Sequence, residues 1–315
     1  MSLLVAMTVW HVEDWRARFQ ALLPELPIVT LDEPFDRRAV HYVASWKHPE
    51  GSLAGLPNLA AIFSLGAGVD HLFADSRLPA VPLARIVDPD LTFRMSEYVV
   101  LHCLMLLRQQ RRYARQQDAG LWEDDRHQPA AREIRVGILG LGELGQDAAR
   151  KLKVIGFDVA GWSRSPKTIP GLATFSGEEG LDQFLARTDI LVCLLPLTPE
   201  TRGMLNRAMF ARLARDGRLP GGPALINAGR GGLQVEADIL AALEAGELGS
   251  AVLDVFETEP LPSDSPLWRH PAVTVTPHNA AMSAPETIAA QVAQQIRRLE
   301  AGEPLQNLVD PARGY

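Results

Sequence analysis

Short apolar runs alternate with amphipathic stretches through the first hundred residues of the chain. Leu3–Val9 is an apolar run that predicts a strand, and His11–Leu23 has the spacing of apolar positions typical of an amphipathic helix. Further strands are expected at Val40–Ser45, Leu59–Leu65 and Val81–Ile86, which Gly, Pro and Asn residues separate. Elements that alternate in this way predict a parallel sheet covered by helices.

A long helical pattern from Arg94 to Gln117 separates this series from a second one that begins at Ile134. Helices fill most of the gaps in the second series, so its six strands can complete a doubly wound sheet. A last helix, Ala284–Ala301, follows the final strand and is free to pack on the first series. The expected strands of the second series are Ile134–Leu139, Phe157–Trp162, Ile190–Leu195, Ala224–Asn227, Ala251–Val255 and Val273–Thr276.

The two series predict an α/β protein with two doubly wound parallel-sheet domains. Because the last helix can return to the first series, we expect a discontinuous substrate-binding domain of flavodoxin-like type, residues 1–95 plus 282–315. A Rossmann dinucleotide-binding domain, residues 96–281, is inserted in it. The cleft between two such domains is the default place for an active site.

The start of the second series carries a glycine motif. The strand at Ile134–Leu139 runs into G-L-G-E-L-G, and a helical pattern follows. Gly140 permits a sharp turn, Gly142 lets the backbone approach a pyrophosphate, and Gly145 lets the helix pack close to its strand. A glycine-rich structural turn is the alternative, but the order of strand, turn and helix favours dinucleotide binding.

The next strand, Phe157–Trp162, indicates which dinucleotide is bound. An enzyme that prefers NAD places an acidic residue at the end of this strand, against the ribose 2′-hydroxyl. Here Ser163, Arg164 and Lys167 follow, and Asp158 lies at the wrong end of the strand. A hydroxyl, a guanidinium and an ammonium suit a 2′-phosphate, so we expect NADPH. A solvated basic turn is the alternative.

The composition is that of a globular protein and excludes several classes of function. Hydrophobic residues make up 47% and charged residues 22% of the 315 residues, and the net charge of −7 argues against a general nucleic-acid binder. The chain has no apolar stretch of the length that a transmembrane helix needs, and its first residues lack the basic segment of a signal peptide. Cys103 and Cys193 lie in apolar stretches, without a His/Cys cluster. We therefore expect no metal site and a reducing, cytoplasmic environment.

Three polar side chains, Arg230, Glu259 and His278, each follow an expected strand of the second series. Open α/β sheets bind ligands at the carboxyl ends of their strands. The three suit reduction of a carbonyl beside a carboxylate. Arginine binds the carboxylate or polarises the carbonyl, histidine donates the proton, and the acidic residue orients the imidazole and favours its charged form. Glu257 competes with Glu259 for the last role, and each residue alone could be an ordinary loop residue.

Over nearly its whole length the sequence resembles the D-isomer-specific 2-hydroxyacid dehydrogenases. The resemblance rests on the order and spacing of five motifs: G-L-G-E-L-G, L-P-L-T-P-E-T at Leu195–Thr201, N-A-G-R-G, D-V-F-E-T-E-P and T-P-H-N-A. Within that family it is most similar to the glyoxylate/hydroxypyruvate reductase A branch. The features in common with the branch are Ser45-Trp46-Lys47, the loop Leu65–Asp70, the turn W-S-R-S-P-K and the ending Val309–Tyr315.

The resemblance implies a role for each motif. Arg230, Glu259 and His278 would be catalytic, with Glu259 on the histidine. Asp254 would bind the nicotinamide carboxamide, and Trp46 would wall the substrate pocket unless it is a core residue. Amides that hold the substrate carboxylate would come from Ala67, Gly68 and Val69. The implied cofactor-binding residues are Gly140, Gly142, Glu143, Leu144, Gly145, Ser163, Arg164, Lys167, Leu195, Pro196, Thr201, Asn227, Ala228, Gly229, Asp254 and His278.

These observations predict NADPH-dependent reduction of a small 2-oxoacid, glyoxylate or hydroxypyruvate, to glycolate or D-glycerate. Trp122 lies in the stretch that this family uses as a dimer arm, so a homodimer is expected. Asn279 and Ala281 depart from residues common in the family and leave the preferred oxoacid open. One alternative is a dehydrogenase for a bulkier oxoacid such as phenylpyruvate, which the pocket near Trp46 and Met95 would discriminate. The other is a cofactor-sensing interaction protein.

Overall fold

We describe a computed structural model of the chain over residues 1–311 and 314. The chain divides into two compact units. The first is Met1–Leu91 with Ser283–Tyr315, and the second is Thr92–Met282. Three residues of the C-terminal motif noted above lie outside the described residues: Ala312, Arg313 and Tyr315.

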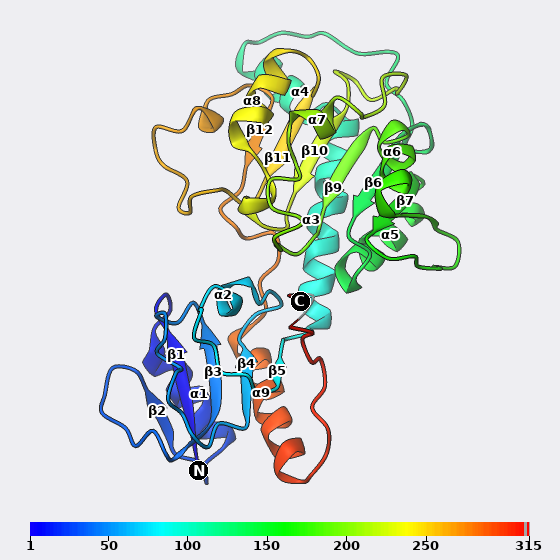
Figure 1. The fold of residues 1–315 in the computed structure, drawn as a ribbon. Helices are drawn as coiled ribbons and strands as arrows, with labels where there is room; N and C mark the ends of the chain where they lie inside the picture. Colours follow the sequence, from blue (N-terminus) through cyan, green and yellow to red (C-terminus); the bar gives the residue numbers. More distant parts are fainter. Residues whose placement is uncertain (312–313, 315) are drawn as a thin grey trace. The chain divides into compact units, whose positions relative to one another are not determined.

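The first unit contains a parallel sheet of five strands in the order β2-β1-β3-β4-β5 (Figure 1). This is the flavodoxin-like order. The pattern of apolar positions did not reveal β2, because three residues are too few to show a period. The strands are β1 Ser2–Met7, β2 Ile28–Thr30, β3 Val40–Trp46, β4 Ala61–Ser64 and β5 Leu83–Ala84, and the helices are α1 Val12–Leu22, α2 Asp70–Phe73 and α9 Pro285–Glu300.

The two ends of the chain build one core in this unit. Every residue of β1 is buried, as expected for a strand covered on both faces. The apolar stripe of α9, with Ile288, Val292 and Ile296, packs into the same cluster as Phe19 of α1. The last helix is therefore part of the hydrophobic core of the first unit.

The second unit contains a parallel sheet of seven strands in the order β12-β11-β10-β9-β6-β7-β8 (Figure 1). Six of these strands follow the Rossmann order, which here reads β8-β7-β6-β9-β10-β11, and β12 extends the sheet beyond β11. The expected number of six strands is wrong by one, because β8 is a half-exposed edge strand without an apolar run. The strands are β6 Arg135–Leu139, β7 Asp158–Ser163, β8 Ala173–Ser176, β9 Ile190–Cys193, β10 Ala224–Asn227, β11 Ser250–Leu253 and β12 Val273–Val275.

The long helix expected at Arg94–Gln117 is two helices, α3 Pro89–Leu107 and α4 Gln110–Asp118. Gln109 lies between them in a left-handed conformation, with φ of 52°. α3 buries seven side chains, whereas α4 buries none. The change from a packed to a solvated helix marks the break that periodicity alone did not reveal. The other helices of this unit are α5 Glu143–Ile155, α6 Gly177–Ala186, α7 Arg207–Phe210 and α8 Glu236–Glu244, with short 3-10 turns at Ala131–Glu133, Gly231–Leu233 and Pro266–Trp268.

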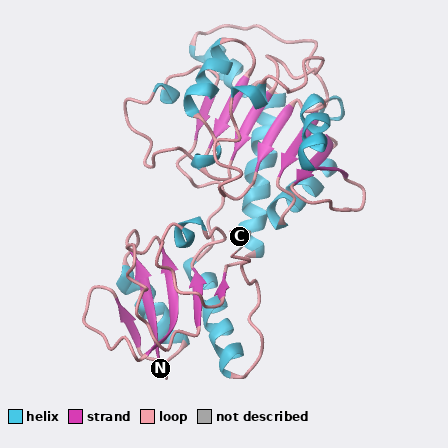
Figure 2. Ribbon diagram, viewed as in Figure 1, coloured by secondary structure: helices cyan, strands magenta, loops and turns pink. Residues whose placement is uncertain are grey.

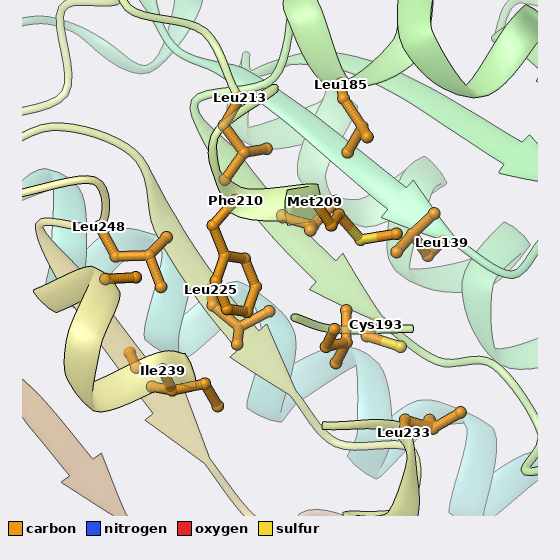
Figure 3. Packing of buried hydrophobic residues seen from close by; sticks show 14 of the residues in the cluster. Leu139, Leu185, Cys193, Met209, Phe210, Leu213, Leu225, Leu233, Ile239 and Leu248 are labelled. Atoms are coloured by element: carbon orange, nitrogen blue, oxygen red, sulfur yellow. The ribbon is translucent and has the colours of Figure 1, made fainter. Parts of the chain in front are cut away.

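Residues of the seven-stranded sheet alternate between two hydrophobic clusters. Cys193 and Leu225 face one cluster, where Leu185, Phe210 and Ile239 from the helices α6, α7 and α8 cover them (Figure 3). The residues next to them along β9 and β10, such as Val192 and Ile226, belong to the cluster on the opposite face of the sheet, under α3 and α5. Helices thus cover both faces of the sheet (Figure 2), and the predicted α/β class with two parallel sheets is confirmed. No helix within residues 1–311 has both the length and the apolar character needed to cross a membrane.

Candidate active site

His278 and Glu259 form a hydrogen-bonded pair beyond the carboxyl ends of β11 and β12. Nδ1 of His278 lies 2.8 Å from Oε2 of Glu259. The other carboxylate oxygen of Glu259 accepts a hydrogen bond of 3.1 Å from the amide of Phe256, which fixes the carboxylate. Because Nδ1 is engaged, Nε2 is the ring nitrogen that can exchange a proton with a substrate. The His278 side chain is 44% exposed, so a ligand can reach it.

Glu257, the other acidic residue of this segment, has a different contact. Its Oε1 accepts a 2.7 Å hydrogen bond from the amide of Glu236, and its own amide donates a 2.8 Å bond to Oε1 of Glu236. This reciprocal pair ties the segment to the first turn of α8. Of the two acidic residues, only Glu259 contacts the histidine.

The turn that carries Arg230 is shaped by two buried amide side chains. Oδ1 of Asn227 accepts from the amide of Gly229 at 3.0 Å, and Nδ2 donates to Oε1 of Gln234 at 2.8 Å and to the carbonyl of Arg230 at 3.2 Å. Gln234 in turn donates a 2.9 Å bond to the carbonyl of Val255. These bonds join the turn after β10 to the segment that leads to Glu259. The implied cofactor residue Asn227 thus holds the arginine-bearing turn, with the whole side chain buried.

The glycine motif Gly140–Gly145 has open space beside Gly142, where a bound dinucleotide would approach the backbone. Gly140 has φ of 102°, which favours glycine. A Cβ on Gly145 would lie 1.9 Å from the carbonyl oxygen of Gly140, so α5 packs directly on the turn. A Cβ on Gly142 would meet no atom within 4 Å. Gly142 is the N-cap of α5, and no side chain caps it. The helix N-terminus at Glu143 and Leu144 therefore suits a bound phosphate group.

The basic turn after β7 is partly held by internal bonds. The hydroxyl of Ser163 donates to the carbonyl of Ser165 at 2.9 Å, and the ammonium of Lys167 donates to the carbonyl of Leu141 at 2.7 Å. Lys167 thus joins the basic turn to the glycine motif. Arg164 is exposed, and its charge also acts on Glu200. A hydrogen bond from Thr198 and the nearby Arg164 charge hold the pKa of Glu200 below its usual range.

The motif at Leu195–Thr201 forms a closed turn. The hydroxyl of Thr201 accepts from the amide of Thr198 at 2.8 Å and donates to the carbonyl of Pro196 at 2.8 Å. Leu195 is buried in the hydrophobic cluster that Figure 3 shows in part. Ala228 and Gly229 begin the neighbouring turn, where a Cβ on Gly229 would lie 2.9 Å from the carbonyl oxygen of Leu195. The two implied cofactor segments are thus adjacent.

In the first unit, the loop after β4 presents unpaired backbone amides. Within the described part of the chain, the amides of Ala67, Gly68 and Val69 donate no hydrogen bond. Ser64 shapes the loop from inside, because its hydroxyl donates a 3.0 Å bond to the carbonyl of Gly68. Three amides on one short loop suit a carboxylate.

Trp46 lies against this loop. A Cβ on Gly66 would be 2.3 Å from a ring atom of Trp46, so the indole covers the start of the loop. The indole stacks on Trp10, with ring centroids 5.4 Å apart and planes 2° apart, and its centroid lies 4.5 Å from that of His71. Trp10 and His71 lie outside the motifs that carry the family resemblance, and no local pattern marks either of them.

Comparisons with known proteins place the chain in a family. Residues 100–280 match the model of the NAD binding domain of D-isomer specific 2-hydroxyacid dehydrogenases. The chain belongs to the D-isomer specific 2-hydroxyacid dehydrogenase family. This confirms the resemblance predicted from the motifs.

Several members of the family are similar to the chain over its whole length. Glyoxylate/hydroxypyruvate reductase A of Serratia proteamaculans is 41% identical, with all of both chains covered. A probable 2-hydroxyacid dehydrogenase from Rhizobium etli CFN 42, solved with NADP, HEPES and L(+)-tartaric acid, is 47% identical with a TM-score of 0.94 and covers 100% of this chain and 99% of that one. An NADPH-dependent glyoxylate/hydroxypyruvate reductase from Sinorhizobium meliloti, solved with NADP and sulfate, is 48% identical with a TM-score of 0.91, and both chains are fully covered.

Proposed function

We propose that the protein is an NADPH-dependent reductase that converts glyoxylate or hydroxypyruvate to the 2-hydroxyacid. The observation that carries the proposal is the hydrogen-bonded pair of His278 and Glu259, next to the turn that carries Arg230. Relatives named glyoxylate/hydroxypyruvate reductase, at 41% and 48% identity over full length, support the substrate class. The Met1–Leu91/Ser283–Tyr315 unit would bind the substrate carboxylate, and the Thr92–Met282 unit would bind the cofactor.

Each of the catalytic side chains has one task in this proposal. His278 donates a proton from Nε2 to the carbonyl oxygen of the substrate. Glu259 orients the imidazole through its hydrogen bond with Nδ1. Arg230 binds the substrate carboxylate or polarises its carbonyl, and the amides of Ala67–Val69 hold the carboxylate and so fix its orientation.

The residues present fit NADPH, which supplies the hydride when it is bound. The open space at Gly142 and the uncapped start of α5 suit the pyrophosphate. Arg164 and Lys167 suit the 2′-phosphate, because the turn after β7 has two cations and no acidic residue. We assign the other cofactor contacts to the turns at Leu195–Thr201 and Asn227–Gly229.

We test the reaction with a panel of 2-oxoacids and both nicotinamide cofactors. Glyoxylate and hydroxypyruvate with NADPH should give the highest kcat/KM. A higher value with phenylpyruvate would replace the proposal by a dehydrogenase for bulkier oxoacids. Binding of NADPH without turnover of any oxoacid would favour a cofactor-sensing protein.

We also propose that the protein forms a homodimer in the cytoplasm. In the second unit, Trp122 is 99% exposed, and Leu121 and Leu101 are more than half exposed. Large apolar side chains at the surface favour an interface. Light scattering should give the mass of a dimer, and a monomer mass at every concentration would contradict this. Cys103 and Cys193 are buried free thiols, which suits a reducing compartment.

A further inference from the structure

A partly buried series of hydrogen bonds leads from α3 to the turn that carries His278. The phenolic oxygen of Tyr98 on α3 lies 2.8 Å from Oγ1 of Thr276. The hydroxyl of Thr276 donates a 2.6 Å hydrogen bond to Oδ1 of Asp254. A carboxylate only accepts, and a threonine hydroxyl has one proton, so Tyr98 must be the donor in its bond with Thr276. The donor and the acceptor of each hydrogen bond in this series are thereby fixed.

The surroundings keep Tyr98 in the donor form. Burial, and after it the negative charge of Asp254, raise the pKa of the Tyr98 phenol. The ring of His102 packs on the ring of Tyr98, with centroids 4.2 Å apart. Burial lowers the pKa of His102, and its Nδ1 has no hydrogen-bond partner among residues 1–311. The contact of His102 with Tyr98 is ring packing.

Asp254 holds the turn on both sides of the histidine. Its carbonyl oxygen accepts the His278 amide at 2.8 Å. Its carboxylate accepts the amides of Asn279 at 3.0 Å and Ala280 at 3.1 Å. His278 has φ of 51°, a left-handed conformation that is unfavourable outside glycine and persists only where the surroundings enforce it. The Asp254 carboxylate therefore helps to fix the backbone that carries the imidazole.

We propose that Tyr98 is a positioning residue for His278 and acts through Thr276 and Asp254. The inference rests on the proposed role of His278 as proton donor. Without the phenolic hydroxyl, Oγ1 of Thr276 loses its donor at a partly buried position, and the Thr276 side chain is held by fewer hydrogen bonds. The bond to Asp254 then weakens and the turn loosens. Proton transfer should suffer more than substrate binding, because it requires the more accurate geometry.

Four variants test the inference in the reductase assay with glyoxylate and NADPH. Tyr98→Phe and Thr276→Val should each lower kcat about tenfold and change the KM for glyoxylate less than twofold. The double variant should be little worse than either single one, because both break the same chain. Thr276→Ser retains the hydroxyl and should keep most of the activity. Tyr113→Phe removes a phenol that accepts from the amide of Asp125, away from this chain, and is the matched control.

A second readout does not depend on turnover. In protein labelled with ¹⁵N-histidine, the His278 signals are identified by their absence from His278→Ala. Tyr98→Phe should shift these signals in the NADPH-bound protein, and Tyr113→Phe should leave them unchanged. An unshifted His278 signal or an unchanged kcat in folded Tyr98→Phe would overturn the inference. Normal turnover by His278→Ala would instead remove the proposed proton donor, and the spectra alone would then decide whether Tyr98 positions the ring.

Discussion

Gly231 lies directly against the main chain at Phe256, where a Cβ on the glycine would be 1.7 Å from the carbonyl oxygen. This contact joins the turn that carries Arg230 to the segment that carries Glu259. Because the obstacle is backbone, Gly231→Ala must displace one of the two segments. We expect the variant to lose about 100-fold in kcat/KM, the effect of a displacement of about 1 Å at a catalytic group.

Gly180→Ala on α6 is the control for this variant. Its Cβ would have its nearest neighbour at 3.5 Å, an ordinary van der Waals distance. Alanine favours a helix over glycine by about 1 kcal/mol, so this variant should be fully active and as stable as the parent or more so. Normal kinetics of Gly231→Ala would show that the two segments need not be in register.

Arg164 should determine the choice of cofactor. Arg164→Ala should raise the KM for NADPH about 10- to 150-fold, because a charge-assisted bond to phosphate contributes about 1.5–3 kcal/mol. The KM for NADH should hardly change, since NADH lacks the 2′-phosphate. Initial rates with each cofactor measure the effect, and Arg126→Ala, which removes an exposed arginine paired with Asp124, is the control. Equal losses with both cofactors would contradict the assignment.

His278 and Glu259 should both be needed for full turnover. His278→Ala should lower kcat at least 100-fold, in the range for a lost general acid. Glu259→Gln keeps the shape of the side chain, but its amide can present NH₂ to Nδ1 of His278 where the carboxylate now presents an oxygen. The variant should therefore lower kcat, though less than His278→Ala does, because the imidazole remains but is held less firmly. Initial rates with glyoxylate and NADPH measure both effects.

Glu257→Gln is the matched control for Glu259→Gln. Glu257 pairs with Glu236 and not with the histidine, so the kcat of this variant should be that of the parent. A loss of kcat in Glu257→Gln and not in Glu259→Gln would reverse the two roles.

Asp75 should contribute stability at neutral pH and lose it in acid. Its carboxylate accepts from the amides of Arg77 at 2.9 Å and Gly51 at 2.8 Å, and lies 3.0 Å from Nε2 of His48. Burial raises the pKa of Asp75, but these bonds outweigh burial and hold the pKa below its usual range. The stabilisation is therefore complete above the unfolded pKa of about 3.9 and is lost as the pH falls through the lower, folded value.

Asp75→Asn tests this contribution. In either orientation, the amide NH₂ would face a backbone N–H, of Arg77 or of Gly51. The variant should lose about 1–3 kcal/mol of unfolding free energy at pH 7 and should show a smaller dependence on pH below about 4. Urea unfolding at several pH values measures both, with Asp124→Asn at an exposed site as control. Parent-like stability at neutral pH would contradict the argument.

The parts of the fold that local pattern controls could be predicted from the sequence. Strands such as Ile190–Cys193 are continuous apolar runs because both faces of the sheet are covered. The edge strand β8 and the helix break at Gln109 could not be predicted in this way, since both depend on where burial ends. In the site, Arg230 and His278 stand in motifs after strands, whereas Gln234 and Tyr98 belong to no motif. Gln234 meets its partner Asn227, and Tyr98 meets its partner Thr276, only because the tertiary fold brings them together.

The placement of α9 in the core of the first unit affects the order in which the protein can fold during synthesis. Ile288, Val292 and Ile296 are translated after the whole second unit, yet they complete the cluster that includes Phe19. The second unit is one uninterrupted segment and can fold as soon as it leaves the ribosome. The first strands must wait with an exposed apolar face until the last helix emerges. A chain truncated before Pro285 would therefore have a complete second unit attached to an unfinished, aggregation-prone sheet.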